Sequence, residues 1–188
     1  MKIGILALQG DFHEHQICFN KLDVETQLVR SLSEFENCDS LVIPGGESTA
    51  ISKLLISTKM DSAIVEKASE GFPIWGTCAG LILISNQIIE KDPVPLKLIN
   101  ITTSRNFYGR QIDSFVEKIH FENSNFEAIF IRAPKIVSTE RDIEVLSSTH
   151  DGTPVAVKSK NIFGTSFHPE LTDDLRIHKL FVDMTSNK

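Results

Sequence analysis

The sequence of 188 residues has little of what several protein classes require. Its three cysteines are Cys18, Cys38 and Cys78. An odd number of widely spaced cysteines argues against a disulfide framework, and the lack of a CxxC pair argues against structural zinc. The apolar runs Ile3–Leu8 and Leu81–Ile84 are far too short to span a bilayer. We therefore expect no disulfides, no metal site and no membrane span.

Positive charge is also scarce. Lys and Arg number 19 against 25 Asp and Glu, which gives a formal net charge of −6, and no basic cluster occurs. Such a chain is poorly suited to bind nucleic acid or an anionic membrane surface. Hydrophobic residues make up 41% and charged residues 23%, which is ordinary for a folded chain and excludes a disordered one. The length fits a single domain over residues 1–188.

The first residues lack the features of a leader. A signal peptide needs a longer apolar region and a cleavage site of small residues, whereas Gln9-Gly10-Asp11 ends the first apolar run after Leu8. We expect Ile3–Leu8 to be a first strand and the protein to be cytoplasmic.

Short apolar runs alternate with amphipathic stretches in the first half. We predict strands at Ile3–Leu8, Thr26–Val29, Ser40–Ile43 and Pro73–Trp75, and helices at Phe12–Leu22, Ser48–Thr58, Met60–Ser69 and Ala79–Asn86. This alternation predicts an α/β fold of three layers, with a mostly parallel central sheet flanked by helices.

The second half is richer in strand signals. Strands are expected at Phe115–Ile119, Ala128–Arg132, Ile143–Ser147, Val155–Lys158 and Ile162–Phe167, and Lys91–Leu98 is expected to be a surface loop. Asp151-Gly152 indicates a hairpin, so this half should add antiparallel strands. The last predicted helix is Thr172–Met184, with Asp173 and Asp174 in its first turn. Its apolar stripe should face the core and consists of Ile177, Leu180, Phe181 and Met184.

The sharpest motif is Gly76-Thr77-Cys78-Ala79-Gly80, which lies between an apolar strand and an apolar helix. Small residues on both sides of the central cysteine suit a tight strand-to-helix turn that exposes its side chain at the edge of the sheet. The positive end of the helix dipole favours a thiolate there. Cys78 is therefore a candidate nucleophile; the alternative is a turn of small residues with an inert cysteine.

A second motif is Ser166-Phe167-His168-Pro169-Glu170. A thiolate nucleophile needs a base, and the base needs an acceptor that orients it. Pro169 disfavours helix at His168, and residues two apart in an extended segment point to the same side. Glu170 can therefore accept a hydrogen bond from His168. Taken alone, His-Pro-Glu is also typical of a surface loop, and its weight comes from Cys78 upstream.

A third motif is Pro44-Gly45-Gly46-Glu47-Ser48, again between a buried strand and a helix. Its glycines permit conformations that turn backbone N–H groups inward, where they can hold a developing oxyanion. It does not match a phosphate loop. The alternative is a glycine turn followed by Ser48 as a helix cap.

The three motifs share one position, because each follows a predicted strand. In an open parallel sheet, sites form at this carboxyl edge. The combination predicts acyl transfer through a cysteine thioester that water then opens.

Segments carrying these motifs resemble the class I (triad-type) glutamine amidotransferases over nearly the whole chain. They are LALQGDFHEH ending at His15, PGGEST at 44–49, GTCAGLI at 76–82, RNFYGRQIDSF at 105–115, FIRAP at 130–134 and SFHPELTDD at 166–174. The motifs PGG, GxCxG and HPE resemble those found across the broad class. LALQG, GRQIDSF, FIRAP and FHPELT resemble more narrowly the Pdx2/PdxT family of glutaminase subunits of pyridoxal 5′-phosphate synthase.

The resemblance implies a flavodoxin-like fold and a cofactor-free hydrolysis of L-glutamine to L-glutamate and ammonia. The ammonia would pass to a separate synthase subunit of TIM-barrel fold (Pdx1/PdxS type) within a large hetero-oligomer. That subunit makes pyridoxal 5′-phosphate from ribose 5-phosphate and glyceraldehyde 3-phosphate. The length leaves no room for a synthase domain in this chain, so the ammonia acceptor should be another protein.

The resemblance also assigns roles to residues. Cys78 is the nucleophile, His168 the base and then the acid, and Glu170 the orienting carboxylate. Gly46 and Ala79 form the oxyanion hole. The implied substrate contacts are Gly46, Glu47, Ser48, Arg105, Ile131 and Arg132.

Two other functions remain open at this point. A stand-alone cysteine hydrolase of γ-glutamyl amides would share the triad and need no partner. A non-catalytic regulatory subunit would have no need for Cys78, His168 and Glu170 together.

The remaining polar residues carry weaker signals. The other histidines have no mutual spacing that suggests a metal or catalysis, although His15 could contact a partner because it lies in a matching segment; they are His13, His15, His120, His150 and His178. Gln9-Gly10 ends the first strand at the same sheet edge. We expect this segment to face the synthase and to help set the oxyanion loop; the alternative is a simple turn.

Overall fold

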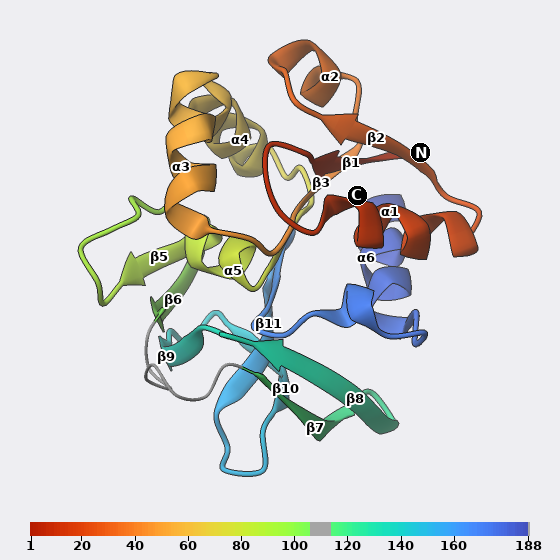
Figure 1. The fold of residues 1–188 in the computed structure, drawn as a ribbon, viewed down its shortest axis with the longest axis vertical. Coiled ribbons are helices and arrows are strands. Elements are labelled where there is room, and N and C mark those ends of the chain that lie inside the picture. Colours follow the sequence, from red (N-terminus) through yellow and green to blue (C-terminus); the bar gives the residue numbers. More distant parts are fainter. Residues whose placement is uncertain (106–113, 188) are drawn as a thin grey trace.

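A seven-stranded sheet runs through the centre of the molecule in the computed structural model, which describes residues 1–105 and 114–187 (Figure 1). In spatial order its strands are β10 (Glu144–Ser148), β11 (Pro154–Ser159), β12 (Ile162–Thr165), β4 (Ile74–Thr77), β3 (Ser40–Ile43), β1 (Lys2–Leu6) and β2 (Glu25–Val29). The strands from β12 to β2 pair in parallel, whereas β10 and β11 are antiparallel additions. The predicted sheet, with its antiparallel strands in the second half, is confirmed.

The central strands are apolar almost throughout because both faces of the sheet are covered. Successive side chains of a strand point to opposite faces. Along β3, for example, Leu41 and Ile43 pack into one hydrophobic cluster, and Val42 between them packs into the other. A strand buried in this way needs a layer of structure on each side.

Helices supply most of these layers (Figure 1). One face is covered by α1 (Phe12–Lys21) and α6 (Arg176–Ser186), and the other by α2 (Leu32–Glu36), α3 (Ser48–Ser57), α4 (Met60–Ser69) and α5 (Ala79–Ile84). On the first face, Phe19 and Phe181 are fully buried in the same cluster as Trp75 of the sheet. On the second face, Ile51 and Ile64 are fully buried. The three-layer prediction is confirmed.

Two smaller sheets extend the second half of the chain. One joins β5 (Ser85–Ile88), β6 (Ile99–Ser104) and β9 (Lys135–Thr139); the other is the hairpin of β7 (Ser114–Phe121) and β8 (Ser124–Ile131). Phe126 and Phe130 of β8 pack against Phe167, which precedes the short 3₁₀ helix η1 (Pro169–Leu171). The hairpin is thereby fixed beside the segment that carries His168.

Several predicted boundaries differ from the structure for local reasons. The helix predicted at Ala79–Asn86 ends at Ile84, because Ser85 is extended (ψ 155°) and its hydroxyl donates to the Ile82 carbonyl at 2.7 Å. The chain continues as β5, which pairs with β6. The short elements α2, β5, β6 and β9 lack a clear apolar period and were not predicted.

The last helix begins later than predicted. It starts at Arg176 instead of Thr172, because the Asp174 carboxylate accepts hydrogen bonds from the Arg176 backbone N–H at 3.1 Å and from its guanidinium at 2.6 Å. Asp173 lies before the helix and pairs with Lys21 at 2.9 Å. The predicted apolar stripe is confirmed, since Ile177 and Phe181 are fully buried.

Other local predictions hold. The Asp151-Gly152 turn joins the antiparallel strands β10 and β11, with Gly152 at φ +83°. Lys91–Leu98 carries no helix or strand. Most of the RNFYGRQIDSF segment, residues 106–113, lies outside the described residues.

Within the described ranges, no helix has the length and apolar character needed to cross a membrane.

Candidate active site

A cavity of about 460 Å³ opens where β1, β3, β4 and β12 end. Its walls contain nine of the ten predicted site residues, and the tenth, Glu170, lies behind His168. The lining consists of Gln9, Gly10, Asp11, Gly46, Glu47, Ser48, Cys78, Ala79, Ile82, Arg105, Ile131, Arg132, His168 and Leu171. The structure thus brings together residues from Gln9 to Leu171 of the sequence at one edge of the sheet.

Cys78 occupies a sharp turn between β4 and α5. Its φ of 48° and ψ of −103° are unusual for a residue with a side chain, and its backbone N–H donates to the Thr165 carbonyl at 2.9 Å. The side chain is 7% exposed, and its Sγ lies 3.8 Å from the Ile131 carbonyl oxygen. This is the turn expected from the small residues of the motif, and it presents the sulfur to the cavity.

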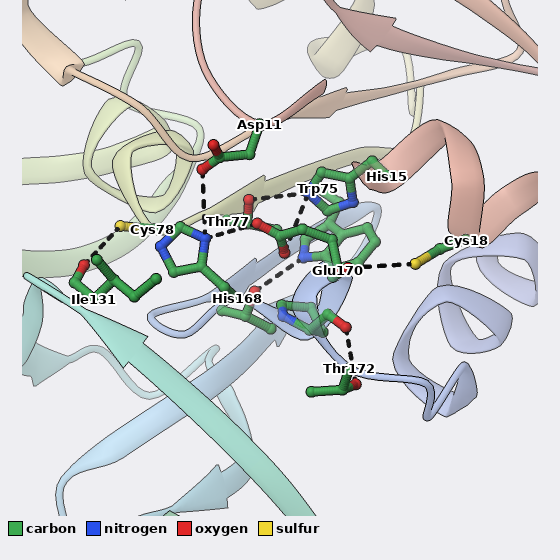
Figure 2. A network of polar contacts seen from close by, with 12 residues as sticks. Asp11, His15, Cys18, Trp75, Thr77, Cys78, Ile131, His168, Glu170 and Thr172 are labelled. Atoms are coloured by element: carbon green, nitrogen blue, oxygen red, sulfur yellow. Dashed lines mark hydrogen bonds and ion pairs between the residues drawn. The ribbon is translucent and has the colours of Figure 1, made fainter. Parts of the chain in front are cut away.

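His168 lies between Cys78 and Glu170 (Figure 2). Its Nδ1 is 2.6 Å from Glu170 Oε1, which is a short, charge-assisted hydrogen bond. Burial disfavours the charged ring, but hydrogen bonding to Cys78 and Glu170 outweighs it and raises the pKa of His168 to about 10. Burial raises the pKa of Glu170, and the hydrogen bond from His168 opposes that rise. The geometry suits a base that is held in one orientation.

Asp11 is a second carboxylate near the same ring nitrogen, and it was not predicted. Its Oδ2 lies 3.7 Å from His168 Nδ1, and its backbone N–H donates to the Gly45 carbonyl at 3.1 Å. Gly45 must lack a side chain, because a Cβ there would lie 2.5 Å from Cε1 of His168. The signal for Asp11 in the sequence was its position, as a polar residue just after the first strand.

The cap of α3 differs from the prediction. Glu47, not Ser48, caps the helix: its carboxylate accepts from the N–H groups of Thr49 at 3.0 Å and Ala50 at 2.7 Å. A charged, longer side chain reaches both donors, which explains the preference over Ser48. Although partial burial opposes it, these hydrogen bonds and nearby Arg105 lower the pKa of Glu47.

Arg105 faces the cavity from the end of β6. One guanidinium nitrogen lies 3.1 Å from Glu47 Oε1, and the other donates to Thr49 Oγ1 at 3.2 Å and to the Asp92 carbonyl at 2.9 Å. Opposite charges of Arg105 and Glu47 therefore stand side by side on the cavity wall. Such a pair can receive a ligand that itself carries both signs of charge.

The predicted oxyanion loop, residues 44–48, is tied by Gln9 to the end of β1. The side-chain oxygen of Gln9 accepts a hydrogen bond from the Glu47 backbone N–H at 2.7 Å, and Gly46 adopts φ +151°. A Cβ on Gly46 would lie 2.6 Å from Gln9 Oε1, so the loop and Gln9 are in close contact. Gln9 therefore fixes the orientation of the Gly46–Glu47 peptide.

One group of side chains could hold a metal ion. The ligand atoms of Asp11, His168 and Glu170 lie within 4.8 Å of one another. However, His168 Nδ1 and Glu170 Oε1 already share a proton at 2.6 Å, which a metal would have to displace. The arrangement fits an oriented base better than a ligand set.

The other two cysteines differ from Cys78. All three thiols are free, but Cys18 and Cys38 lie outside the cavity. Burial raises the pKa of Cys18 to about 11 and also raises that of Cys38. Neither is suited to act as a thiolate nucleophile.

Two buried histidines lie behind the predicted triad and were not themselves predicted as site residues. His15 and His178 are fully buried, with His15 Nδ1 3.1 Å from His178 Nε2. The suggestion that His15 contacts a partner is wrong, because its side chain is inaccessible. The available signal was helical spacing: His15, Cys18 and Phe19 share the buried face of α1.

Burial of His178 predicts a pH-dependent loss of stability. Burial lowers its pKa from 6.5 to about 3, so the unfolded chain binds a proton between these values that the folded chain does not. The free energy of unfolding should therefore fall as pH drops through this window, by about 1.4 kcal/mol per pH unit for this group. In His178→Phe, the loss between about pH 7 and about pH 5 should be about 2 kcal/mol smaller than in the wild type.

Urea unfolding of both proteins at the two pH values measures this difference. Equal losses in the two proteins would contradict the assignment of a neutral His178 in the folded state.

Comparison with known proteins identifies relatives over nearly the whole length. The model of the SNO glutamine amidotransferase family matches residues 5–187. Pyridoxal 5′-phosphate synthase subunit PdxT of Thermosipho africanus is 45% identical over 186 residues, covering 98% of each chain. PdxT of Thermotoga petrophila is 46% identical over 187 residues, covering 98% of this chain and 99% of its own. A crystal structure of a glutamine amidotransferase superposes with a TM-score of 0.93 at 36% identity, covering 98% of both chains.

Proposed function

Because the chain belongs to the SNO glutamine amidotransferase family, we propose that it hydrolyses L-glutamine to L-glutamate and ammonia as the glutaminase subunit of a pyridoxal 5′-phosphate synthase. The observation that carries the proposal is the cavity at one sheet edge, where Cys78 and His168 face each other and Glu170 lies 2.6 Å behind the imidazole. Relatives at 45–46% identity that are named PdxT support the narrower assignment.

The chemistry begins at the sulfur. His168 takes the thiol proton of Cys78, and the sulfur attacks the side-chain amide carbon of glutamine to form a tetrahedral oxyanion. Glu170 keeps the imidazole oriented and stabilises its charged form through Nδ1. His168 then gives its proton to the departing nitrogen, so ammonia leaves and a γ-glutamyl thioester remains.

The second half of the reaction restores the enzyme. His168 removes a proton from water as the water oxygen attacks the thioester carbon. The carbon–sulfur bond then breaks, His168 returns the proton to the Cys78 sulfur, and glutamate is released. The oxyanion of both steps would be held by the backbone N–H groups of Gly46 and Ala79, two residues that line the same cavity. No metal or cofactor enters either step.

The cavity wall supports an amino acid as the substrate. Arg105 provides a cation for the α-carboxylate, and Glu47 provides an anion for the α-ammonium group. Ser48, Ile131 and Arg132 complete the substrate contacts. Because the Arg105 guanidinium is already held by Glu47, Thr49 and the Asp92 carbonyl, little ordering remains to be done on binding.

The ammonia requires an acceptor outside this chain. In this proposal, residues 1–188 form a single glutaminase domain that works in the cytoplasm. Its partner is a synthase subunit of TIM-barrel fold, of the Pdx1/PdxS type, in a large hetero-oligomer. That subunit uses the ammonia to build pyridoxal 5′-phosphate from ribose 5-phosphate and glyceraldehyde 3-phosphate.

Gln9 offers a test of how the oxyanion loop is set. In Gln9→Ala, the Glu47 N–H loses its acceptor, so ammonia release stimulated by the synthase should fall about tenfold, whereas the free energy of unfolding should change by about 1 kcal/mol or less. Steady-state kinetics and urea unfolding measure the two effects.

The matched control is Gln16→Ala on α1, whose amide donates to Thr26 Oγ1 at 3.3 Å away from the cavity. That variant should keep wild-type turnover. If Gln9→Ala loses stability as much as it loses turnover, the role assigned to Gln9 is wrong.

The proposed function is tested by measuring ammonia release from L-glutamine by the purified chain, with and without the synthase subunit. We expect release that the synthase raises strongly. High turnover without any synthase would support the stand-alone hydrolase instead. No release under either condition would support a non-catalytic regulatory subunit.

A further inference from the structure

The second carboxylate oxygen of Glu170 faces His15. Glu170 uses Oε1 to bind His168, while Oε2 points to the opposite side, where His15 Nε2 lies 3.5 Å away (Figure 2). The side chains of both Glu170 and His15 are completely buried. His15 is therefore the group that meets the far side of the orienting carboxylate.

Glu170 Oε2 lacks a hydrogen bond within the described part of the chain. A buried carboxylate oxygen without a donor is costly, so the nearest donor gains most from approaching it. His15 Nε2 is also 3.2 Å from the Thr77 hydroxyl, which precedes Cys78. Catalytic hydrogen bonds are often long in the free enzyme and shorten in the reacting complex. A small movement of either side chain would complete this contact.

The protonation of His15 follows from its neighbours. Burial and the nearby His178 lower the pKa of His15 well below 6.5, and burial lowers that of His178 to about 3, so both rings are neutral. Each neutral ring has one N–H donor and one acceptor nitrogen. A bare Nε2 lone pair on His15 would face the Glu170 carboxylate and be repelled by it.

The favourable arrangement places the protons in series. His178 Nε2–H donates to His15 Nδ1 across 3.1 Å, which leaves the His15 proton on Nε2, aimed at Glu170 Oε2 and Thr77. The hydrogen bond on one ring nitrogen thus sets the tautomer of the other. His178 Nδ1 has no hydrogen-bond partner among the described residues. It is the acceptor nitrogen that this arrangement of protons leaves without a donor.

We propose that His15, held in its Nε2–H tautomer by His178, is a positioning residue that donates to Glu170 Oε2 and keeps the Glu170 carboxylate charged and aligned with His168. The inference rests on the proposed function, because its effect on catalysis is exerted through the triad. It extends the orienting system from a single carboxylate to a buried relay that links α1 and α6 to the base.

The charged and titratable surroundings of Glu170 allow a pH test. His168 lies on one side of the carboxylate, Asp11 contributes a second negative charge from the end of β1, and the Cys18 thiol faces the Glu170 carbonyl from α1. His178 stands behind His15 on α6. None of these four groups contacts Glu170 Oε2 in the described part of the chain; His15 does. Removal of His15 should therefore act specifically on the protonation of Glu170.

Two amide substitutions at His15 distinguish the hydrogen bond that it donates from the volume that its side chain fills. In His15→Gln the amide reaches the position of Nε2 and can still donate, whereas in His15→Asn it reaches only the position of Nδ1. We expect His15→Asn to lower kcat roughly tenfold to a hundredfold while KM stays within about threefold. We expect His15→Gln to stay within about threefold of the wild type in both.

The pH profile distinguishes positioning from a loss of packing. Removing a donor to the carboxylate raises the pKa of Glu170, so Glu170 takes up a proton at higher pH as the pH is lowered. The acid limb of the kcat profile should therefore move to higher pH in His15→Asn and remain in place in His15→Gln. His13→Gln, on the exposed side of α1, serves as the surface control and should leave the profile unchanged.

The assays use the full chain with the synthase subunit, and urea unfolding is measured for each variant. Equal kcat in the Asn and Gln variants, or a reduced kcat in His15→Asn with an unmoved acid limb, would overturn the proposal. If the wild type itself releases no ammonia, the proposed function fails. Nitrogen NMR of the imidazoles still decides the tautomer: a protonated Nε2 on His15 supports the inference, and a protonated Nδ1 overturns it.

Discussion

Cys78→Ala is expected to reduce synthase-stimulated ammonia release from glutamine by at least about a thousandfold. The variant lacks the atom that attacks the amide carbon, and the cavity offers no second thiol to replace it, because Cys18 and Cys38 lie outside its walls. His168 and the oxyanion donors remain, so a small residual rate above the uncatalysed one is consistent with the account. Steady-state ammonia release, measured with the synthase subunit in excess, gives the ratio.

The control variants for this prediction are Cys18→Ala and Cys38→Ala. Both should keep turnover close to that of the wild type, although each loses some packing since both thiols are buried. Binding of glutamine to Cys78→Ala, measured by calorimetry, should survive, because the charged contacts of Arg105 and Glu47 are intact. Turnover in Cys78→Ala within tenfold of the wild-type rate would contradict the assignment of the nucleophile.

Gly80→Ala is expected to destabilise the fold by at least about 3 kcal/mol. Gly80 lies in the first turn of α5, where the helix passes directly over β3. A Cβ at this position would lie 1.9 Å from the carbonyl oxygen of Ile43 and 2.8 Å from its carbonyl carbon. Backbone atoms cannot rotate away as a flexible side chain can, so α5 must move, and Cys78 at its start moves with it. Urea unfolding at neutral pH gives the free energy difference.

Gly71→Ala is the matched control for this prediction. Gly71 has φ +92° and no atom within 4 Å of the position of an added Cβ, so its cost is backbone strain of about 1–2 kcal/mol. Activity gives a second readout: Gly80→Ala should lose ammonia release even under conditions where it remains folded, whereas Gly71→Ala should not. Equal destabilisation by the two substitutions would contradict the close packing of α5 on β3.

Much of the fold follows from apolar patterning in the sequence. The central parallel strands β1, β3 and β4 are buried on both faces, so their apolar runs are easily recognised, whereas the edge strand β2 is more polar and gives a weaker signal. Long amphipathic helices such as α1 and α4 were placed to within a residue for the same reason. The short strands β5, β6 and β9 carry Ser, Thr and Asn, and their pairing depends on partners distant in sequence, which no local pattern reports.

Part of the candidate site could likewise be predicted from the sequence, and part of it could not. Cys78, Gly46 and His168 lie in strand-to-helix and strand-to-loop turns whose sequence is constrained by the turn itself, so their convergence could be predicted from the spacing of motifs. The cap of α3 could not be predicted, because the Ser48 hydroxyl and the Glu47 carboxylate are both plausible caps. Only the geometry shows that the Glu47 carboxylate accepts from Thr49 and Ala50.

The buried histidine relay was missed for another reason. His15 and His178 are 163 positions apart in sequence, and their contact with each other and with Glu170 exists only after α1 and α6 pack on the same face of the sheet. A histidine on the apolar face of a helix is usually a satisfied core residue. Its meaning here comes from the unsatisfied oxygen of Glu170, which no sequence pattern reveals.

The measurement that tests the central claim most directly is covalent labelling with a chloroketone analogue of glutamine in the presence of the synthase subunit, followed by peptide mass spectrometry. The reagent places an electrophilic carbon where the amide carbon of glutamine would lie, so it reports both the nucleophile and the ligand recognised by the cavity. The account predicts labelling of one cysteine, Cys78, and protection from labelling by L-glutamine. Labelling of Cys18 or Cys38 instead, or labelling of Cys78 that glutamine does not slow, would contradict it.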